Sequence, residues 1–406
     1  VIFKRIMEAN KNLNKKLISF IRIIMIITGY WDRPISSIKF INRCLHVYSV
    51  GMRASCFIFW IFLVAELIRL IIFNYPEEVI MSSMAVVVTQ LRVITRSWTY
   101  LKHNTLDIFN QILDGDQETW VYGEREIEEV YRKKTKFLNI GAAIFIAADA
   151  MTVISLDTVG VMGTLKIHSH NLATNETLES HLMLQLIFPL NNMAHIKAYF
   201  ISETFWSWIG FTQNVATELI YVTILVYGAI SLEVIQVKFR SFVQADFELF
   251  SSEDKVQEKT CILRALIQEH QSIILFITQF NKKVKYITMV EFIFSSLDLA
   301  SICTTKDMKI EEDGWRFFYA ILMVTQLFLI GWNCNEIAIQ SENIGIAIFQ
   351  SKWYVLSQEA KQMLLCVITR AKRPLLMTIG PFGPMTTDSV VLILKAAYSY
   401  INIMKK

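Results

Sequence analysis

Residues 205–232 read FWSWIGFTQNVATELIYVTILVYGAISL, and Glu218 is the only charged side chain among them. A helix needs about 20 mostly apolar residues to cross the hydrocarbon core of a membrane. Within that core the backbone N–H and C=O groups have no water to bond, so a spanning segment has to satisfy them itself, as a helix does. The stretch therefore predicts a transmembrane helix.

Further stretches of the same kind occur along the chain. The expected spans are residues 54–73, 79–100, 137–157, 205–232, 286–303, 315–338 and 386–404. The last is interrupted by Lys395 and is weaker on hydropathy alone. Hydrophobic residues make up 53% of the chain and the mean hydropathy is +0.40, values that soluble domains rarely reach. We therefore expect an all-α fold, a seven-transmembrane-helix membrane protein.

Lys and Arg are unevenly distributed over the segments outside the expected spans. They are frequent in residues 1–53, 101–136, 233–285 and 339–375, and scarce in residues 74–78, 158–204 and 304–314. Cytosolic connections of membrane proteins carry the excess of Lys and Arg. The pattern predicts a cytosolic N-terminus and, after seven spans, an extracellular C-terminus. The sequon at Asn175 falls in the expected outer loop, where glycosylation can occur.

The first segment begins with basic side chains and continues with an apolar run over residues 17–29. That run is too short to span a bilayer, Arg22 interrupts it, and no small-x-small cleavage site follows. We therefore expect residues 1–53 to be a cytosolic or interfacial segment rather than a signal peptide.

Two connections on the expected cytosolic side carry apolar residues at helical spacing. The first pattern runs over residues 255–285 and leads into the fifth span, and the second covers residues 342–373 and ends before Pro374. We expect a helical insertion at 233–285 and an anchor helix within 339–375 that assemble with their equivalents in neighbouring subunits. Helices lying on the membrane surface are the alternative. The candidate assembly contacts are Trp353, Tyr354, Leu364 and Ile368.

Catalytic and metal-binding signatures are absent from the sequence. The six cysteines form no C-x-x-C pair, and no GxSxG, HExxH, P-loop or dinucleotide fingerprint occurs. His168, His170 and His181 lie in the expected outer loop and are interpreted as loop residues rather than a metal site. We expect no enzyme activity, no cofactor, no metal and no nucleic-acid partner.

Charged residues within the expected spans are costly unless they pair, face water or reach the interface. They are Glu66, Arg69, Arg92, Arg96, Asp149, Glu218 and Asp298. Glu66 and Arg69 have i,i+3 spacing and could pair on one helix face. We expect structural roles for this set.

Three segments resemble the insect odorant receptors. They are HQSIILF at residues 270–276 before the fifth span, Trp353-Tyr354 after the sixth, and the final run RPLLMTIG (373–380) followed by VLILKAAYSY (391–400). The regions that contain them cover about a quarter of the chain. The remainder is similar to the family in topology and loop lengths.

The resemblance implies a tetrameric, odorant-gated cation channel in the plasma membrane of sensory neurons. Most tuning subunits of the family assemble with a shared co-receptor (Orco), here expected in a heterotetramer embedded in lipid. The chain lacks the longer second cytosolic loop of that co-receptor and therefore resembles a tuning subunit. The related gustatory receptors carry a Gln-Phe pair in the last span. Here the corresponding residues are Ser399 to Asn402, which favours the odorant branch.

Polar side chains form a stripe on the expected last helix. Asp388, Leu392, Lys395, Ser399, Asn402 and Lys406 share one face. Such a stripe has to avoid lipid, and in a tetramer whose last helices surround an axis it suits a pore lining. We expect residues 384–406 to form the pore-lining seventh span, and the resemblance puts the apolar gate at Ile403. A polar seam within one subunit is the alternative.

The resemblance places the ligand pocket in the outer half of the six-span bundle, residues 54–338. Aromatic and Met side chains with a few polar groups suit a small hydrophobic odorant. The candidates are Val86, Gln90, Ala148, Met151, Phe205, Trp208, Thr212, Phe318 and Leu322. Packing or lipid contact is the alternative for each of them.

Two other receptor classes are weighed against this interpretation. A gustatory-type chemoreceptor channel would share the topology. A G-protein-coupled receptor would need the opposite orientation, an Asn-Pro pair in the last span and a Cys in the second outer loop, and the chain has neither sequence feature.

Overall fold

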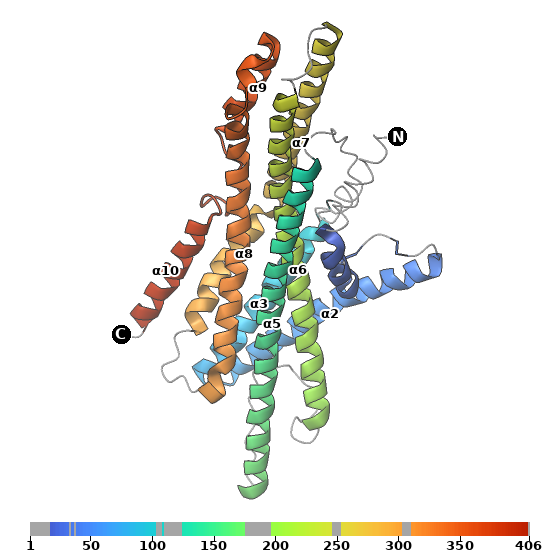
Figure 1. Cartoon of the computed structure of the whole chain (residues 1–406). Helices are drawn as coiled ribbons and strands as arrows, with labels where there is room; N and C mark the ends of the chain where they lie inside the picture. The colour runs from blue at the N-terminus through green and yellow to red at the C-terminus, as the bar shows by residue number, and fades with distance from the viewer. Residues whose placement is uncertain are drawn as a thin grey trace.

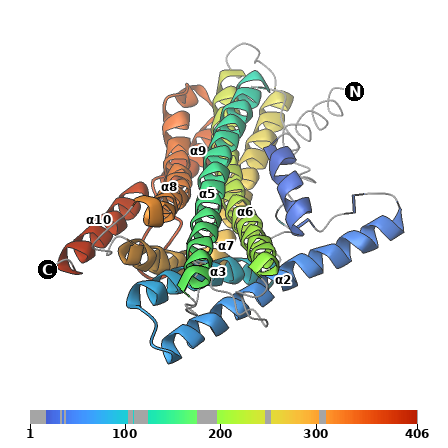
Figure 2. The same cartoon turned by 90° about the horizontal axis from the view of Figure 1, so that it is seen from below.

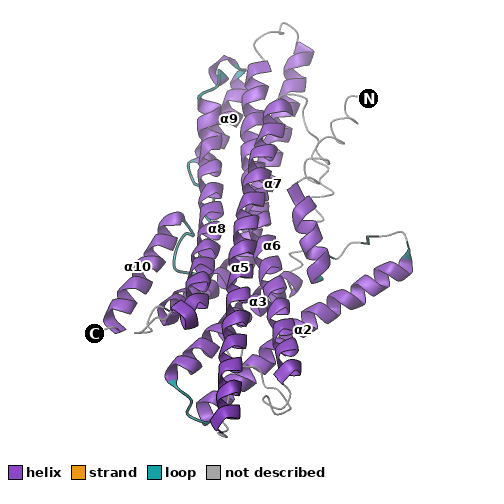
Figure 3. Cartoon of the chain, turned by 60° about the horizontal axis from the view of Figure 1, so that its bottom comes forward, coloured by secondary structure: helices purple, strands orange, loops and turns teal. Residues whose placement is uncertain are grey.

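The computed structural model describes residues 17–31, 34–35, 38–102, 108, 124–174, 196–245, 253–302 and 310–404. The main helices are α2 (Lys39–Ile72), α3 (Glu77–Lys102), α5 (Glu124–Thr174), α6 (Ile196–Ala245), α7 (Glu253–Ile302), α8 (Ile310–Phe349), α9 (Gln358–Ala371) and α10 (Thr387–Met404), with the short 3-10 helix η1 (Trp353–Val355) before α9. No strand occurs in this part of the chain (Figure 3), so the predicted all-α fold is confirmed.

Five of the described helices are long and apolar enough to cross a membrane. They cover residues 39–72, 79–102, 125–174, 197–243 and 314–349. Helices α7 and α10, which contain most of the fifth and all but the first residue of the seventh expected span, are not among these five.

The helices are much longer than the spans that hydropathy indicates. Helix α5 has 51 residues, and α6 and α7 have 50 residues each. At about 1.5 Å per residue each is about 75 Å long, more than twice the roughly 30 Å of a hydrocarbon core. Helix α7 runs unbroken through the amphipathic segment into the fifth expected span. The expectation that residues 158–204 form a loop needs correction. Residues 158–174 continue α5, and residues 196–204 begin α6.

Helix α6 is the centre of the bundle. It contacts α2, α3, α5, α7 and α8, and 89% of its most apolar stretch is buried, against 28–50% in the other four apolar helices. Figures 1 and 2 show α2 and α10 on opposite sides of this bundle. Residues 205–232 of α6, the fourth expected span, thus form the stretch that most of the other helices pack against.

The connection between α9 and α10 is anchored on α7. Asn281 on α7 accepts a hydrogen bond from the backbone N of Thr378 at 3.0 Å, and the N of Gly380 donates to the carbonyl of Lys285 at 2.9 Å. Gly380 has φ +52°, and a Cβ there would lie 2.8 Å from the sulfur of Met289. The break that the glycines and prolines of this stretch predict is therefore a structured turn that fixes the start of α10.

Helix α9 packs against α7 and α8 outside the expected spans. His270 on α7 is buried there with its ring against Phe239, their centroids 6.4 Å apart. Burial, with a contribution from Arg370, lowers the pKa of His270 to about 4. The imidazole is therefore uncharged at neutral pH and packs as an apolar group.

The α8–α10 contact generates a prediction about packing. A Cβ added at Gly331 of α8 would lie 2.5 Å from Cγ2 of Val390, whose branched side chain has little rotamer freedom, and 3.3 Å from the carbonyl of Thr386. Gly331→Ala should therefore force α10 away from α8 and destabilise the protein by about 1–3 kcal/mol. The measurement is the thermal midpoint of the detergent-solubilised protein.

Gly228→Ala on α6 is the matched control, because its nearest atoms would lie at an ordinary 3.6 Å. A midpoint for Gly331→Ala equal to that of Gly228→Ala would contradict the close approach of the two helices.

Candidate ligand-binding site

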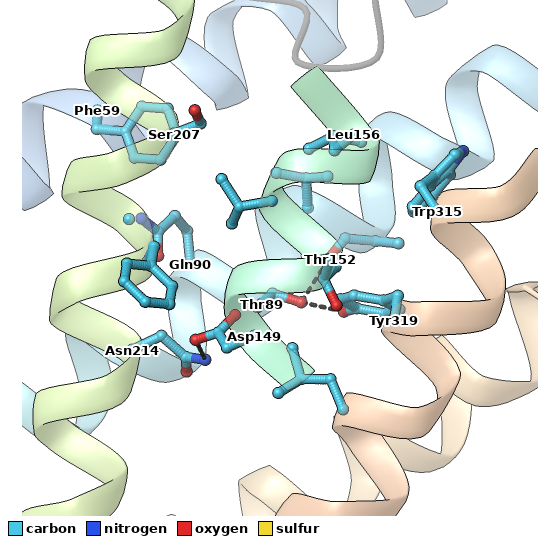
Figure 4. Close-up of a pocket in the computed structure, with 16 residues that line it drawn as sticks. Phe59, Thr89, Gln90, Asp149, Thr152, Leu156, Ser207, Asn214, Trp315 and Tyr319 are labelled. Atoms are coloured by element: carbon cyan, nitrogen blue, oxygen red, sulfur yellow. Dashed lines mark hydrogen bonds between the residues drawn. The ribbon is translucent and has the colours of Figure 1, made fainter. Parts of the chain in front are cut away.

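A cavity of about 90 Å³ lies between α2, α3, α5, α6 and α8 (Figure 4). Its wall is formed by Phe59, Ala85, Val86, Thr89, Gln90, Asp149, Thr152, Val153, Leu156, Ser207, Gly210, Phe211, Asn214, Trp315, Tyr319 and Leu322. The lining is mostly apolar with a few polar groups, which is the composition of small-molecule sites. A cavity of roughly 150 Å³ is known to hold benzene, so a ligand with one ring would have to displace side chains here.

Gln90 of α3 occupies the α6 side of the cavity. Its side chain is 4% exposed, and its Nε2 has no hydrogen-bond partner among the described residues. A Cβ at Gly210 would lie 2.8 Å from this Nε2 and 3.0 Å from the ring of Phe59. The missing side chain of Gly210 is what makes room for the amide.

Asp149 of α5 faces Asn214 of α6 across the cavity. Nδ2 of Asn214 donates to Oδ2 of Asp149 at 2.8 Å, and both residues are buried. A carboxyl group buried among apolar side chains is costly without partners. The pair therefore joins α5 to α6 and places a strong acceptor in the cavity wall.

Tyr319 of α8 connects the cavity to a charged cluster. Its hydroxyl hydrogen-bonds Thr89 of α3 and donates to Oδ2 of Asp298 of α7 at 3.3 Å. Nη2 of Arg92 lies 3.2 Å from the same oxygen of Asp298, and Nη1 of Arg92 donates to Ser295 at 2.7 Å. A side chain that lines the cavity is thus bonded to an ion pair between α3 and α7.

A second ion cluster lies one helical turn further along α3. Nη1 of Arg96 is 2.7 Å from Oε2 of Glu218 on α6, and Nη2 pairs with Oε1 of Glu291 on α7. Gln326 of α8 donates to Glu218 at 3.0 Å and to Glu291 at 2.7 Å. All four side chains are at least 98% buried. Together they join α3, α6, α7 and α8 at one level of the bundle. The expected pair of Glu66 and Arg69 is also present, at 2.7 Å.

The structure brings three of the predicted pocket residues together at the cavity: Val86, Gln90 and Leu322. The other six, Ala148, Met151, Phe205, Trp208, Thr212 and Phe318, do not line it. They lie on helices that do, and Met151, Phe205 and Trp208 are 49%, 59% and 40% exposed on the outside of the single chain. Asp149, Asn214 and Tyr319 line the cavity although they were not among the predicted pocket residues.

The predicted pore residues are on or beyond α10. Asp388, Lys395 and Ser399 are exposed, and the hydroxyl of Ser399 donates to the carbonyl of Lys395 at 2.9 Å. Asn402 and Ile403 belong to the helix, although their side chains are not described. Lys406 and the sequon residue Asn175 lie outside the described residues.

The predicted assembly residues differ in accessibility. Tyr354 is exposed, and Trp353 and Ile368 are partly exposed, on η1 and α9. Leu364 is fully buried in the core of its own chain. Leu364 therefore has no surface left for a neighbouring subunit, because the apolar face of α9 that contains it packs against α7 and α8.

The family model of the seven-transmembrane odorant receptors matches residues 75–398. The chain belongs to this family. It is a family of receptors and not of enzymes. The chain is 29% identical to Odorant receptor 10 of Aedes albopictus over 189 residues, which are 46% of this chain and 49% of that one. It is 25% identical to Odorant receptor Or2 of Anopheles gambiae over 146 residues, 36% of this chain and 39% of that one. These alignments span about half or less of the relatives' length.

Solved structures share the fold over nearly the whole chain. The olfactory receptor OR5 of Machilis hrabei in complex with eugenol superimposes with a TM-score of 0.74 at 14% identity, covering 97% of this chain and 99% of that one. A second structure of that receptor gives a TM-score of 0.78 at 14% identity, covering 96% and 97%. The predicted seven-transmembrane fold of an insect odorant receptor is thus confirmed.

The Arg96 cluster generates a prediction about folding. Arg96→Met leaves Glu218 and Glu291 buried without their cation, which should destabilise the receptor by about 3–5 kcal/mol. The thermal midpoint and the yield of folded receptor should both fall sharply. Lys133→Met removes an exposed pair with Glu129 at 2.9 Å and should cost less than about 1 kcal/mol.

Adding Glu291→Gln to Arg96→Met removes one of the unpaired charges and should restore part of the loss. Equal midpoints for Arg96→Met and Lys133→Met would show that the cluster does not hold the helices together.

Proposed function

We propose that the chain is the odorant-tuning subunit of a ligand-gated cation channel. A small hydrophobic odorant binds in the cavity between α2, α3, α5, α6 and α8. The observation that carries this proposal is a mostly apolar cavity between five helices in a chain of this family. The existence of a eugenol complex of Machilis OR5, which has the same fold, supports it.

The pore is assigned to α10. This helix has 18 residues, about 27 Å, close to the thickness of the hydrocarbon core. It packs on α7 and α8, and its polar residues Asp388, Lys395 and Ser399 are exposed. Polar side chains on a membrane helix have to face water or other helices. Four such helices around an axis meet that need, with Asn402, Ile403 and Lys406 toward the end of the pore and Ile403 as its gate.

A continuous set of contacts supports transmission from cavity to pore. The Tyr319 hydroxyl in the cavity wall is bonded to Asp298 of α7. Further along the same helix, Met289 packs on Gly380, and Asn281 bonds the turn that begins α10. An odorant that binds more tightly to one arrangement of these contacts shifts the closed–open equilibrium by that difference in affinity.

The assembly is a heterotetramer with the family's co-receptor in the plasma membrane of sensory neurons. The N-terminus is cytosolic and the C-terminus extracellular, so that the cavity faces the outer half of the membrane and Asn175 is open to glycosylation. The cytosolic contacts between subunits come from the anchor segment 339–375, where Trp353, Tyr354 and Ile368 retain exposed surface.

Filling the cavity tests the site. Ala85 of α3 lines the cavity and is 4% exposed, and Ala85→Leu adds three carbons to a space of about 90 Å³. We expect at least a tenfold loss of odorant sensitivity with unchanged surface expression, because the ligand and the new side chain compete for one volume. The measurement is odorant-evoked whole-cell current in cells that also express the co-receptor, across a broad odorant panel.

Ala54→Leu is the matched control, since Ala54 is exposed on α2. The site assignment fails if both variants keep the dose–response curves of the unaltered chain.

Weakening the anchor of α10 on α7 tests the transmission. Asn281→Ala removes the bonds to residues 376–378 without touching the cavity. We expect a change of at least threefold in the maximal odorant-evoked current per channel at the surface, while the rank order of odorants stays the same. Thr278→Ala is the control, because Thr278 is exposed and its hydroxyl bonds only its own helix, at Ile274. An unaltered maximal current in Asn281→Ala would show that the bonds between α7 and the turn before α10 do not contribute to channel opening.

A further inference from the structure

Two polar groups in the cavity wall have hydrogen-bonding capacity that the described residues leave unused. Nε2 of Gln90 has no partner, although the side chain is 96% buried. Asp149 is equally buried, and its carboxyl group accepts a single hydrogen bond, from Asn214, among the described residues. Buried donors and acceptors are nearly always paired, and leaving them unpaired costs free energy. Both groups therefore point to a ligand that completes them.

Gln90 of α3 and Asp149 of α5 both lie against α6, at neighbouring turns of that helix. The Gln90 amide packs at Gly210, where a Cβ would lie 2.8 Å from Nε2. The Asp149 carboxyl is bonded to Asn214. Residues 210 and 214 are four apart on one helix, about one turn or roughly 6 Å along the axis. Figure 4 shows Gln90 and the bonded pair following one another along the cavity side of α6.

A single small ligand can serve both groups, because Gln90 and Asp149 line the same cavity of about 90 Å³. Hydrogen bonds to oxygen are about 2.8–2.9 Å long, so the ligand oxygen has to lie within that distance of each group. The amide can only donate through its nitrogen, and the carboxyl keeps an acceptor oxygen in either protonation state. The bridging group must therefore accept one hydrogen bond and donate another.

A hydroxyl group meets that requirement with a single atom. An ether, ester or ketone oxygen accepts but does not donate, an ammonium donates but does not accept, and a hydrocarbon does neither. The rest of the wall is mostly apolar, with Phe59, Leu156 and Trp315 around it, and the hydroxyls of Thr152 and Ser207 already donate to Ala148 and Asp157. The cavity thus combines one polar position with a surround suited to a hydrocarbon body.

We propose that the ligand of this cavity is a small hydroxyl compound, an alcohol or a phenol, whose oxygen accepts from Gln90 Nε2 and whose O–H donates to Asp149. This rests on the function proposed above, with the cavity as the odorant site. Asp149 and Gln90 are then specificity-determining residues. A site built to bond a hydroxyl discriminates strongly against analogues that lack it, because its own groups are left unpaired.

The test uses sets of compounds that differ only in the polar group. Benzyl alcohol, benzyl methyl ether, benzylamine and ethylbenzene form one set, and hexanol, its methyl ether, hexylamine and heptane form a second. Each is applied to cells that express the receptor with its co-receptor, and half-maximal concentrations are measured from the current. We expect the alcohol of at least one set to be tenfold or more as potent as its three analogues.

Two substitutions separate the two hydrogen bonds. Asp149→Leu should lower the potency of the alcohol about tenfold and leave the ether unchanged, because only the alcohol donates. Gln90→Leu should lower the potencies of alcohol and ether alike. Asp149→Asn keeps an acceptor oxygen and should retain part of the alcohol's advantage. Surface labelling and the response to ethylbenzene or heptane confirm that each variant folds and opens.

Several results would overturn the proposal. Equal potency of an alcohol and its ether in both sets would show that no donor is recognised, and a more potent amine would assign Asp149 to an ion pair instead. An Asp149→Leu variant that folds and keeps the alcohol's advantage would remove Asp149 from the site. In all three cases the receptor still responds, so the proposed function survives. A receptor silent to every compound of a broad panel, with the co-receptor present, would instead count against the function itself, and the hydroxyl proposal would fall with it.

Discussion

The guanidinium of Arg96 lies in the middle of a bundle that a membrane surrounds, where no bulk water solvates it. Its charge has to be met by groups from other helices, and Glu218 and Glu291 meet it from α6 and α7. Gln326 completes the arrangement from α8. Apolar contacts alone give membrane helices little preference for one register, because lipid tails are as apolar as the side chains they replace. A buried charge with defined partners supplies that register, and the positions of four helices depend on it.

The level at which this cluster lies determines where the cavity can be. Above it, Arg92 pairs with Asp298 and Tyr319 bonds both Thr89 and Asp298, so the polar network reaches the cavity wall. Beyond Tyr319 the side chains between the helices are mostly apolar and leave a gap. The same α7 that carries Glu291 and Asp298 carries the residues on which α10 is anchored. The charge network and the anchor of α10 therefore share one long, continuous helix, and the cavity wall is joined to it by the hydrogen bond from Tyr319 to Asp298.

Hydropathy was sufficient to predict the helices but not the faces they turn inward. In a soluble bundle the apolar face marks the core, whereas in a membrane both the core and the lipid accept apolar side chains. Met151 and Phe205 were therefore placed in the pocket because they are large and apolar, and they lie on the outside of the single chain. Gln90 does line the cavity, and Asp149 and Asn214 line the opposite wall, in keeping with the rule that polar residues avoid lipid.

Helix ends and subunit contacts were harder to predict from the sequence, for other reasons. Helix α5 continues past residue 157 to Thr174 although most of residues 158–174 are exposed or partly exposed, whereas the length of a membrane crossing alone ended the expected span at residue 157. Leu364 was assigned to a neighbouring subunit because α9 is amphipathic, but an amphipathic helix can cover its own chain as well as a partner. Periodicity identifies the face that is buried and does not identify what buries it.

The ion pairs of Arg96 and the largely apolar cavity are formed by different residues. This separation has a consequence for how the sequence can diverge. Substitutions at wall positions such as Ala85, Val86 or Val153 change the shape of the cavity without touching the ion pairs that set the helix register. Chemical sensitivity can thus drift quickly within a lineage while the architecture persists. The fold shared with OR5 of Machilis hrabei, at a TM-score of 0.74 and 14% identity, shows how much substitution this arrangement of helices tolerates.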